Sequence, residues 1–127
     1  FSRLGFHPGF GISVTLPRLI GHSQADLMTF TGRRIKGDEA VAMGLADELV
    51  GLAEVRDRAH TLAAEIAASA PLAVRTIRDT ARRGLADAVE AMTAHELEIQ
   101  TSLRKTTDFK EGIKAMAERR APDFKGS

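Results

Sequence analysis

Residues 53–121 are rich in alanine and place their larger apolar side chains at helical spacing, which leaves this part of the chain little choice of secondary structure. A first helix is predicted around residues 55–66, and it ends before Pro71. A second is predicted over residues 72–83, where Gly84 stops it. More than half of the chain is therefore expected to be helical.

The next predicted helix carries a seam of side chains that alternates steps of four and three residues, as in a coiled coil. The seam consists of Leu85, Val89, Met92, Glu96, Ile99 and Leu103. Glu96 is its one charged residue, and two placements stay open for it. It can pair across an interface or, as is more common, lie at the wet edge of the seam. A last helix is predicted to start at a capping box of Asp108 and Glu111 and to end before Pro122.

The first 52 residues alternate short elements with glycine and proline. An extended segment or strand is predicted over residues 1–6, followed by a loop. The pattern then predicts a helix that Pro17 should kink or interrupt, and a helical stretch from Ser23 that Gly32 ends. A short helix over residues 38–43 and a half-buried strand over residues 45–50 complete this region.

The composition excludes several classes of protein. A 43% hydrophobic and 28% charged chain is typical of a globular domain, and no apolar run approaches the roughly 20 residues of a membrane span. Without cysteine there is no disulfide framework, thiol nucleophile or thiolate metal site, and the histidines show no metal-binding spacing. A net charge of +1 without interleaved basic and aromatic residues argues against nucleic-acid binding.

Six stretches, in the same order along the chain, resemble the signatures of the enoyl-CoA hydratase/isomerase (crotonase) superfamily. They cover nearly the whole chain, and together they are far more specific than any one alone. The stretches are LGFHPG at 4–9, LPRLIG at 16–21, TGRRIKGDEA at 31–40 with Gly44-Leu45 after it, SAPLA at 69–73, DFKEG at 108–112 and ERRAPDF at 118–124.

The resemblance implies an α/β fold, a crotonase-like ββα spiral, of which this chain holds the mostly helical C-terminal half. Residues 1–52 would be the end of the core with a loop beside the active site, and residues 53–127 a helical oligomerisation region. The first half of the family supplies the two backbone amides of the oxyanion hole and one hydratase glutamate. We therefore expect an N-terminal half, upstream of Phe1, to carry that machinery.

The two positions at which this half of the family can hold a catalytic acid are both apolar here. The second hydratase glutamate corresponds to Phe1, four residues before Gly5, and the isomerase acid that follows the proline corresponds to Gly9. We therefore expect no catalytic residue in this half, with His7 as a minor candidate for a general base. His7 more commonly caps a backbone group in such a loop.

The same loop provides the expected substrate-binding residues, which are Phe1, His7, Pro8, Gly9 and Phe10. Apolar walls suit an acyl chain, although a place in the core is an equal alternative for Phe1 and Phe10 and the preferred one for Phe6. The resemblance places Arg119 at a position that helps to hold the phosphates of coenzyme A, with Lys125 as a weaker candidate.

These features predict part of a cytoplasmic enzyme that acts on acyl-CoA thioesters through an enolate stabilised by an oxyanion hole. Coenzyme A would enter as part of the substrate, with no other cofactor and no metal. The expected partners are the N-terminal half and further copies in a homotrimer or hexamer. The alternative is a non-catalytic crotonase-like paralogue or a helical assembly module.

Overall fold

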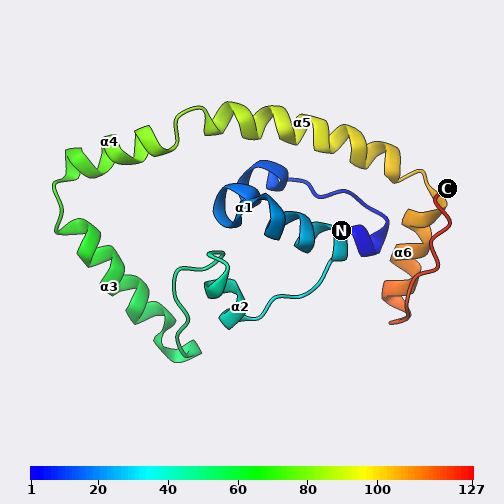
Figure 1. Cartoon of the computed structure of the whole chain (residues 1–127), viewed down its shortest axis with the longest axis horizontal. Coiled ribbons are helices and arrows are strands. Elements are labelled where there is room, and N and C mark those ends of the chain that lie inside the picture. The colour runs from blue at the N-terminus through cyan, green and yellow to red at the C-terminus, as the bar shows by residue number, and fades with distance from the viewer.

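The computed structural model describes residues 1–127 and is built from helices alone (Figure 1). Two are short 3-10 helices, η1 (Ser2–Leu4) and η2 (Leu52–Glu54). The others are α1 (Ile12–Thr31), α2 (Gly37–Ala42), α3 (Val55–Ala67), α4 (Pro71–Ala81), α5 (Leu85–Leu103) and α6 (Thr107–Ala117). The mostly helical character expected from the sequence is confirmed. None of these helices combines the length and the apolar character that crossing a membrane requires.

Both predicted strands are wrong. Residues 1–6 begin with η1, in which the amide of Leu4 donates to the carbonyl oxygen of Phe1 at 2.7 Å, and Gly5 ends the turn in the left-handed region. Residues 45–50 form bends and irregular chain. A strand needs a neighbouring strand to satisfy its backbone groups, and this chain contains no strand that could pair with either segment.

The predicted interruption of α1 occurs at Gly21 and not at Pro17. Gly21 has φ 77° and ψ 159°, a conformation that is open almost only to glycine. Pro17 lies within the helix four residues earlier, at the cost of one backbone hydrogen bond. α1 therefore consists of two helical segments joined at Gly21. Its end at Gly32 is as predicted, because Gly32 adopts the left-handed conformation and its amide donates to the carbonyl oxygen of Met28.

The N-terminal segment is the centre of the packing. α1 packs against α5, and η1 packs against both α1 and α6. The buried apolar side chains are few, namely Ile20, Ala25 and Ala115. Gly112 brings α6 onto the backbone of η1, since a Cβ atom at this position would lie 2.4 Å from the carbonyl carbon of Leu4. The C-terminal helices thus fold back on the first residues of the chain.

α3, α4 and α5 follow one another around the outside of α1 and α2 (Figure 1). α3 and α4 contain no buried residue. Their apolar stripes are exposed, including Val55 and Ile66 on α3 and Leu72 and Ile77 on α4. The outer helices are therefore amphipathic elements whose apolar faces are uncovered within this chain.

Candidate functional site

The candidate site is built around the loop between η1 and α1, residues 5–11. The loop ends in two successive residues with positive φ, Phe10 at 63° and Gly11 at 70°. Such a conformation is unfavourable for phenylalanine, and strained residues of this kind tend to cluster at functional sites. The loop therefore holds the backbone of Phe10 in a costly conformation.

A cavity of about 290 Å³ lies between this loop and α1. Ring and aliphatic side chains form its apolar walls, and His7, His22 and Asp26 bring titratable groups to it. The apolar part is formed by Phe6, Pro8, Ile12, Leu16, Pro17 and Phe30. An apolar hollow with a few polar groups is the usual character of a small-molecule site.

His7 uses one ring nitrogen within the loop itself. Its Nδ1 lies 2.7 Å from the carbonyl oxygen of Pro8, so Nδ1 carries a proton and donates it to this hydrogen bond. The arrangement agrees with the sequence expectation that His7 caps a backbone group. In the neutral ring Nε2 is then a free acceptor, on a residue that lines the cavity.

The predicted substrate-binding residues do not all lie together. His7 and Pro8 line the cavity, whereas Phe1, Gly9 and Phe10 are not part of its wall. Phe10 is 85% exposed and Phe1 46%, so the alternative of a core position is wrong for both. Gly9 is buried against α5.

Phe6, which the sequence assigns to the core, is half-buried and packs against Phe109 of α6 with 5.0 Å between ring centroids. The guanidinium carbon of Arg104 lies 5.4 Å from the centre of the same ring, within range of a cation–π contact. Phe6 therefore joins the loop to α5 and α6, while its ring also reaches the cavity.

Glu96 is the residue of this site whose position the sequence did not predict. It is 0% exposed, so the expectation that it lies at the wet edge of a seam is wrong. Its carboxylate accepts hydrogen bonds from the backbone amides of Gly11 at 2.7 Å and Ser13 at 3.0 Å. Burial opposes the charge, but the hydrogen bonds from Ser13 and Gly11 outweigh it and hold the pKa of Glu96 below its ordinary value. The one signal in the sequence was the single acid on an apolar seam.

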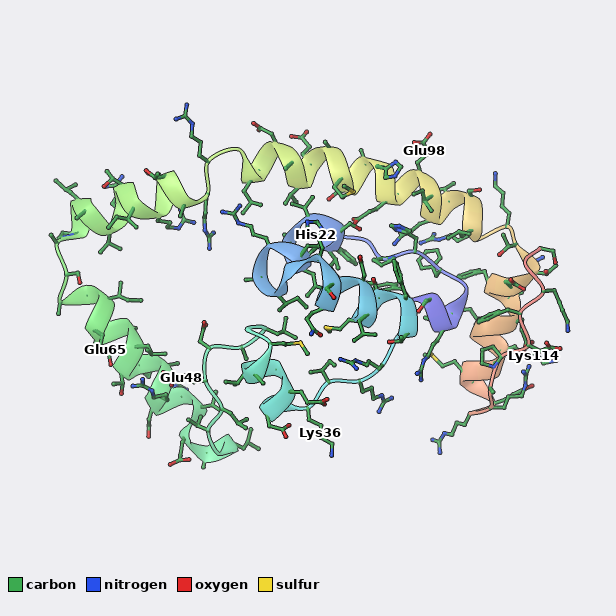
Figure 2. The ribbon with its side chains drawn as sticks, viewed as in Figure 1. His22, Lys36, Glu48, Glu65, Glu98 and Lys114 are labelled. Atoms are coloured by element: carbon green, nitrogen blue, oxygen red, sulfur yellow. The ribbon has the colours of Figure 1, made fainter.

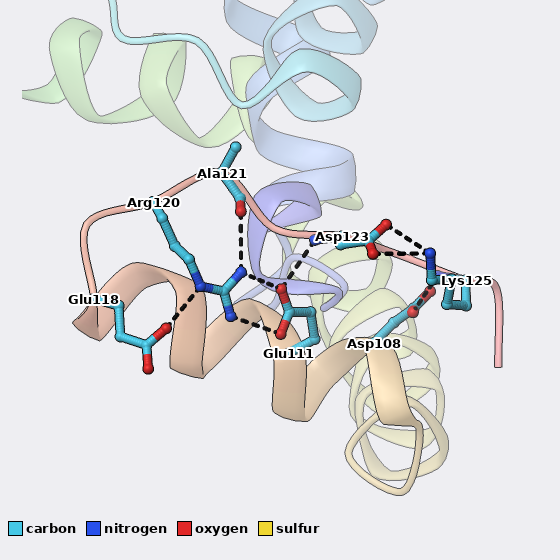
Figure 3. A network of polar contacts seen from close by, with 7 residues as sticks. All are labelled: Asp108, Glu111, Glu118, Arg120, Ala121, Asp123 and Lys125. Atoms are coloured by element: carbon cyan, nitrogen blue, oxygen red, sulfur yellow. Dashed lines mark hydrogen bonds and ion pairs between the residues drawn. The ribbon is translucent and has the colours of Figure 1, made fainter.

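The C-terminal segment forms a second polar cluster, shown in Figure 3. Arg120 binds both carboxylate oxygens of Glu111, at 2.5 and 2.9 Å, and also donates to Glu118 at 2.7 Å. Glu111 further accepts from the amide of Asp123 at 2.9 Å. The Arg120 guanidinium is the main reason that the pKa of Glu111 falls to about 2.

The same cluster corrects the predicted start of the last helix. The helix is capped by Thr106, whose hydroxyl accepts from the amide of Phe109 at 3.1 Å. Asp108, the predicted cap, instead accepts from the amides of Lys125 and Gly126 at 2.7 and 2.8 Å. Both acids of the predicted capping box therefore tie down the C-terminal segment.

The two residues predicted to hold coenzyme A differ in their surroundings. Lys125 is engaged within the cluster, because its Nζ donates to Asp123 at 2.8 Å. Arg119 is exposed, forms no side-chain hydrogen bond or ion pair, and has a positive φ of 54°. The paired neighbour Arg120 thus fixes the chain beside Arg119 and leaves the Arg119 guanidinium open to a ligand.

No group of three or more histidine, aspartate or glutamate side chains is arranged so that it could hold a metal ion.

The profile of the enoyl-CoA hydratase/isomerase family matches residues 1–127. The chain therefore belongs to this family, as the six sequence stretches predicted.

Two curated relatives and one solved structure illustrate the likeness. The chain is 34% identical over 117 residues to short-chain-enoyl-CoA hydratase of Clostridium acetobutylicum, with 92% of this chain and 45% of that protein covered. It is 36% identical over 119 residues to (E)-benzylidenesuccinyl-CoA hydratase of Thauera aromatica, with 94% and 46% covered. The crystal structure of carnitinyl-CoA hydratase from Mycobacterium avium superposes with a TM-score of 0.87 at 29% identity, over 99% of this chain and 49% of that one.

The chain spans about half the length of the curated relatives that it matches. The matched part is their C-terminal half, and the absence of strands agrees with the helical character of that half. The predicted fold class, a crotonase-like α/β spiral of which this chain holds the helical C-terminal part, is confirmed.

Proposed function

We propose that these residues form the C-terminal part of an acyl-CoA site in an enzyme of the enoyl-CoA hydratase/isomerase family. The observation that carries the proposal is the match of the family profile to residues 1–127, and the apolar cavity beside the loop supports it. Each of the relatives described above is named for a coenzyme A thioester. The substrate class proposed here is therefore an enoyl- or acyl-CoA, with coenzyme A bound as part of the substrate.

In the proposed reaction the thioester carbonyl is polarised by the two backbone amides of an oxyanion hole, which the family carries in its other half. Their hydrogen bonds stabilise the enolate, and this electrostatic term usually contributes most to such a reaction. In hydration, a base takes a proton from water, the water oxygen bonds to the β-carbon, and the resulting enolate receives a proton at the α-carbon. Because Phe1 and Gly9 replace both possible acids of this half, the acid–base work would fall to the other half.

In this proposal the loop and the C-terminal segment bind opposite ends of the substrate. His7 and Pro8 line the cavity for the acyl group, and the exposed rings of Phe1 and Phe10 would offer further apolar surface to the substrate. The open guanidinium of Arg119 would pair with a phosphate of coenzyme A, in the charge-assisted way that suits arginine. Lys125, already paired with Asp123, would contribute less.

The test is a binding and turnover assay of the whole protein to which these residues belong. Crotonyl-CoA and longer or aromatic enoyl-CoA thioesters are titrated by calorimetry, and turnover is followed by the loss of conjugated-thioester absorbance. We expect binding, and about a tenfold weaker binding in Arg119→Ala if that charge meets a phosphate. Arg75→Ala, an exposed arginine on α4, is the matched control. Failure to bind any acyl-CoA overturns the proposal.

The other half and the oligomer belong to the same proposal. The whole protein, in which a cytoplasmic location is expected, would assemble as a homotrimer or hexamer. Intact mass tests the first part, since a mass near 13.7 kDa excludes an attached other half and about twice that value supports one. Native mass spectrometry tests the second. Hydration of crotonyl-CoA by residues 1–127 alone would show that the main catalytic groups lie within this chain after all.

A second candidate function is a non-catalytic paralogue or an assembly module, which is favoured by the uncovered apolar faces of α3 and α4. Patches of this kind commonly mark interaction surfaces. An assembly module would form oligomers without binding acyl-CoA, so the same calorimetric titration separates the two candidates.

A further inference from the structure

The end of the loop and the first residues of α1, residues 7–13, are held by two side chains of α5 that lie one helical turn apart. The Nε2 of Gln100 donates to the carbonyl oxygen of His7 at 2.9 Å. Glu96 accepts from the amides of Gly11 and Ser13 at 2.7 and 3.0 Å. These bonds join residues that are more than 80 positions apart in the sequence, and they fix the loop backbone on both sides of Pro8, Gly9 and Phe10.

The surfaces of the loop and α5 are also fitted closely to each other. A Cβ atom at Gly9 would lie 2.6 Å from Nε2 of Gln100. At Gly11 it would lie 2.8 Å from Cγ1 of Val89. At Gly11 the positive φ of 70° adds to this requirement for glycine, whereas at Gly9 the end of the Gln100 side chain would have to move. α5 therefore acts as a shaped support for the loop as well as a hydrogen-bond partner.

Glu96 takes the place of an N-terminal side-chain cap, which α1 does not have. The residue before the helix, Gly11, has no side chain and makes no side-chain cap hydrogen bond, so the first amides of α1 need an acceptor from elsewhere. A carboxylate at a helix N-terminus also interacts favourably with the helix dipole. The amides of Gly11 and Ser13 directly follow the strained Phe10. Their two hydrogen bonds to Glu96 therefore offset the cost of the positive φ at Phe10.

We propose that Glu96 and Gln100 are positioning residues, which set the loop conformation that the acyl thioester meets without touching the substrate themselves. The inference rests on the proposed acyl-CoA function. α5 would then do more than join subunits or fill the core, because two of its polar side chains determine the geometry of a loop that lines the cavity.

The test compares three variants of the whole protein. Glu96→Gln keeps the shape but offers only one good acceptor to two amides, and Gln100→Met keeps the volume but removes the donor to His7. Glu98→Gln is the matched control, since Glu98 is exposed on the outer side of α5 (Figure 2). Amide exchange of residues 7–14, and kcat and KM for an enoyl-CoA, are measured at a temperature where circular dichroism shows each variant folded.

We expect faster exchange of the loop amides and about a tenfold or larger fall in kcat/KM in Glu96→Gln, because a small misplacement of a positioned group is costly in rate. Gln100→Met should show a smaller effect of the same kind, since it loses a hydrogen bond between uncharged groups. Glu98→Gln should match the wild-type enzyme in every measurement.

Two results overturn the inference. The first is loop exchange unchanged in both variants. The second is faster exchange with wild-type kcat and KM, which would give Glu96 and Gln100 a role in stability alone. A failure of the proposed function is distinguishable, because the wild-type protein itself would then bind no acyl-CoA, whatever the exchange of the loop amides in the variants.

Discussion

His7 occupies a position where a structural role and a chemical role make different demands on the two ring nitrogens. Nδ1 donates to the carbonyl oxygen of Pro8, and Nε2 is the only ring nitrogen left to act as a base. Asparagine places its amide nitrogen close to the position of Nδ1, whereas glutamine places it close to that of Nε2. The two substitutions therefore separate the cap from the base.

If His7 acts only by capping the carbonyl oxygen of Pro8, His7→Asn should keep the stability and turnover of the wild-type protein. His7→Gln should lower the free energy of unfolding by about 1 kcal/mol, the usual contribution of one hydrogen bond. Urea unfolding and steady-state assays of the whole protein measure both. A large loss of turnover in His7→Asn with unchanged stability would instead assign base chemistry to Nε2.

Phe1 stands where the resemblance places the second acid of a hydratase. The side chain is 46% exposed, so a carboxylate there needs little desolvation. Because general acid–base groups contribute about 10²- to 10⁴-fold to rate, Phe1→Glu should raise hydration of crotonyl-CoA by the whole protein at least about tenfold. Phe1→Gln, which has the same shape without the charge, should not. Equal rates in the two variants and the wild type would show that this position does not meet the substrate.

Single residues also show where sequence reasoning reaches its limit. The spacing of the seam put Glu96 on the same face as its apolar neighbours, but spacing carries no information about a partner 85 residues away. The resemblance selected Arg119 for coenzyme A, but it did not show which of Arg119 and Arg120 is paired within the chain. Only the structure pairs Arg120 with Glu111 and leaves Arg119 open. In both cases the missing information was a contact between residues that are not neighbours in the sequence.

At the scale of elements, the contact of α6 with η1 depends on one missing side chain. A Cβ atom at Gly112 would lie 2.4 and 2.5 Å from the carbonyl carbon and oxygen of Leu4, which are backbone atoms that cannot rotate away. In an exposed helix, glycine to alanine stabilises by roughly 1 kcal/mol. At Gly112 the steric overlap with Leu4 should outweigh the gain in helix propensity, since overpacking typically costs about 1–3 kcal/mol.

Gly112→Ala should therefore lower the free energy of unfolding by about 1–2 kcal/mol in spite of the better helix propensity. Chemical denaturation followed by circular dichroism measures this change. Lys114→Ala, on the exposed part of the same helix (Figure 2), is the control and should be nearly neutral. A more stable Gly112→Ala variant would mean that α6 is not held against η1.

The C-terminal segment is expected to respond to acid through Glu111. Its pKa is lowered from 4.5 to about 2, chiefly by Arg120, so the folded segment favours the charged carboxylate. This contribution is complete above the ordinary pKa near 4.5 and is lost as the pH falls through about 2. The segment of residues 118–126 should therefore loosen from α6 between these values.

The measurement is the pH dependence of the amide signal of Asp123, which donates to Glu111 at 2.9 Å, by nuclear magnetic resonance. A midpoint near 2 is expected. Glu111→Gln should abolish this titration and loosen the segment at neutral pH. A midpoint near the ordinary value of 4.5 would show that the carboxylate is not paired with Arg120 in solution.

The helices were predictable because helical hydrogen bonds are local. The predicted ranges for α3, α4 and α5 agree with the observed ones to within a few residues, and Gly32 ends α1 as predicted. Gly84 does not end the helix before it as predicted, because α4 already ends at Ala81 and Gly84 instead directly precedes α5. The two strands failed for the opposite reason, since pairing depends on a partner elsewhere. Burial in residues 45–50 does not follow the alternation, since Leu45, Ala46 and Val50 are half-buried and Leu49 is exposed. An exposed ion pair from Glu48 to Arg58 at 2.5 Å ties the segment to α3.

At the scale of the whole molecule, the balance of buried and exposed surface stands out. Only seven of the 127 residues are buried, and one of these is the charged Glu96. Folded chains of this size normally bury well over half of the surface of the unfolded chain, and the apolar core supplies most of the driving force. The side chains that would form a larger core are present, but they lie on open helix faces. Examples are Leu52, Leu72 and Ile77, which are 94%, 72% and 67% exposed.

Residues 1–127 produced alone should therefore associate with one another, because exposed apolar faces of this extent are rarely stable in water. Light scattering over a range of concentrations should show a mass that rises with concentration, and the chain should bind a dye that reports exposed apolar surface.

Ile77→Glu and Leu72→Glu on α4 should reduce the association, since each places a charge on the uncovered face. Thr76→Glu, at an exposed position of the same helix, adds the same single charge and is the control. A folded monomer that binds no dye at any concentration would show that these faces need no partner, and would count against a role for them in assembly.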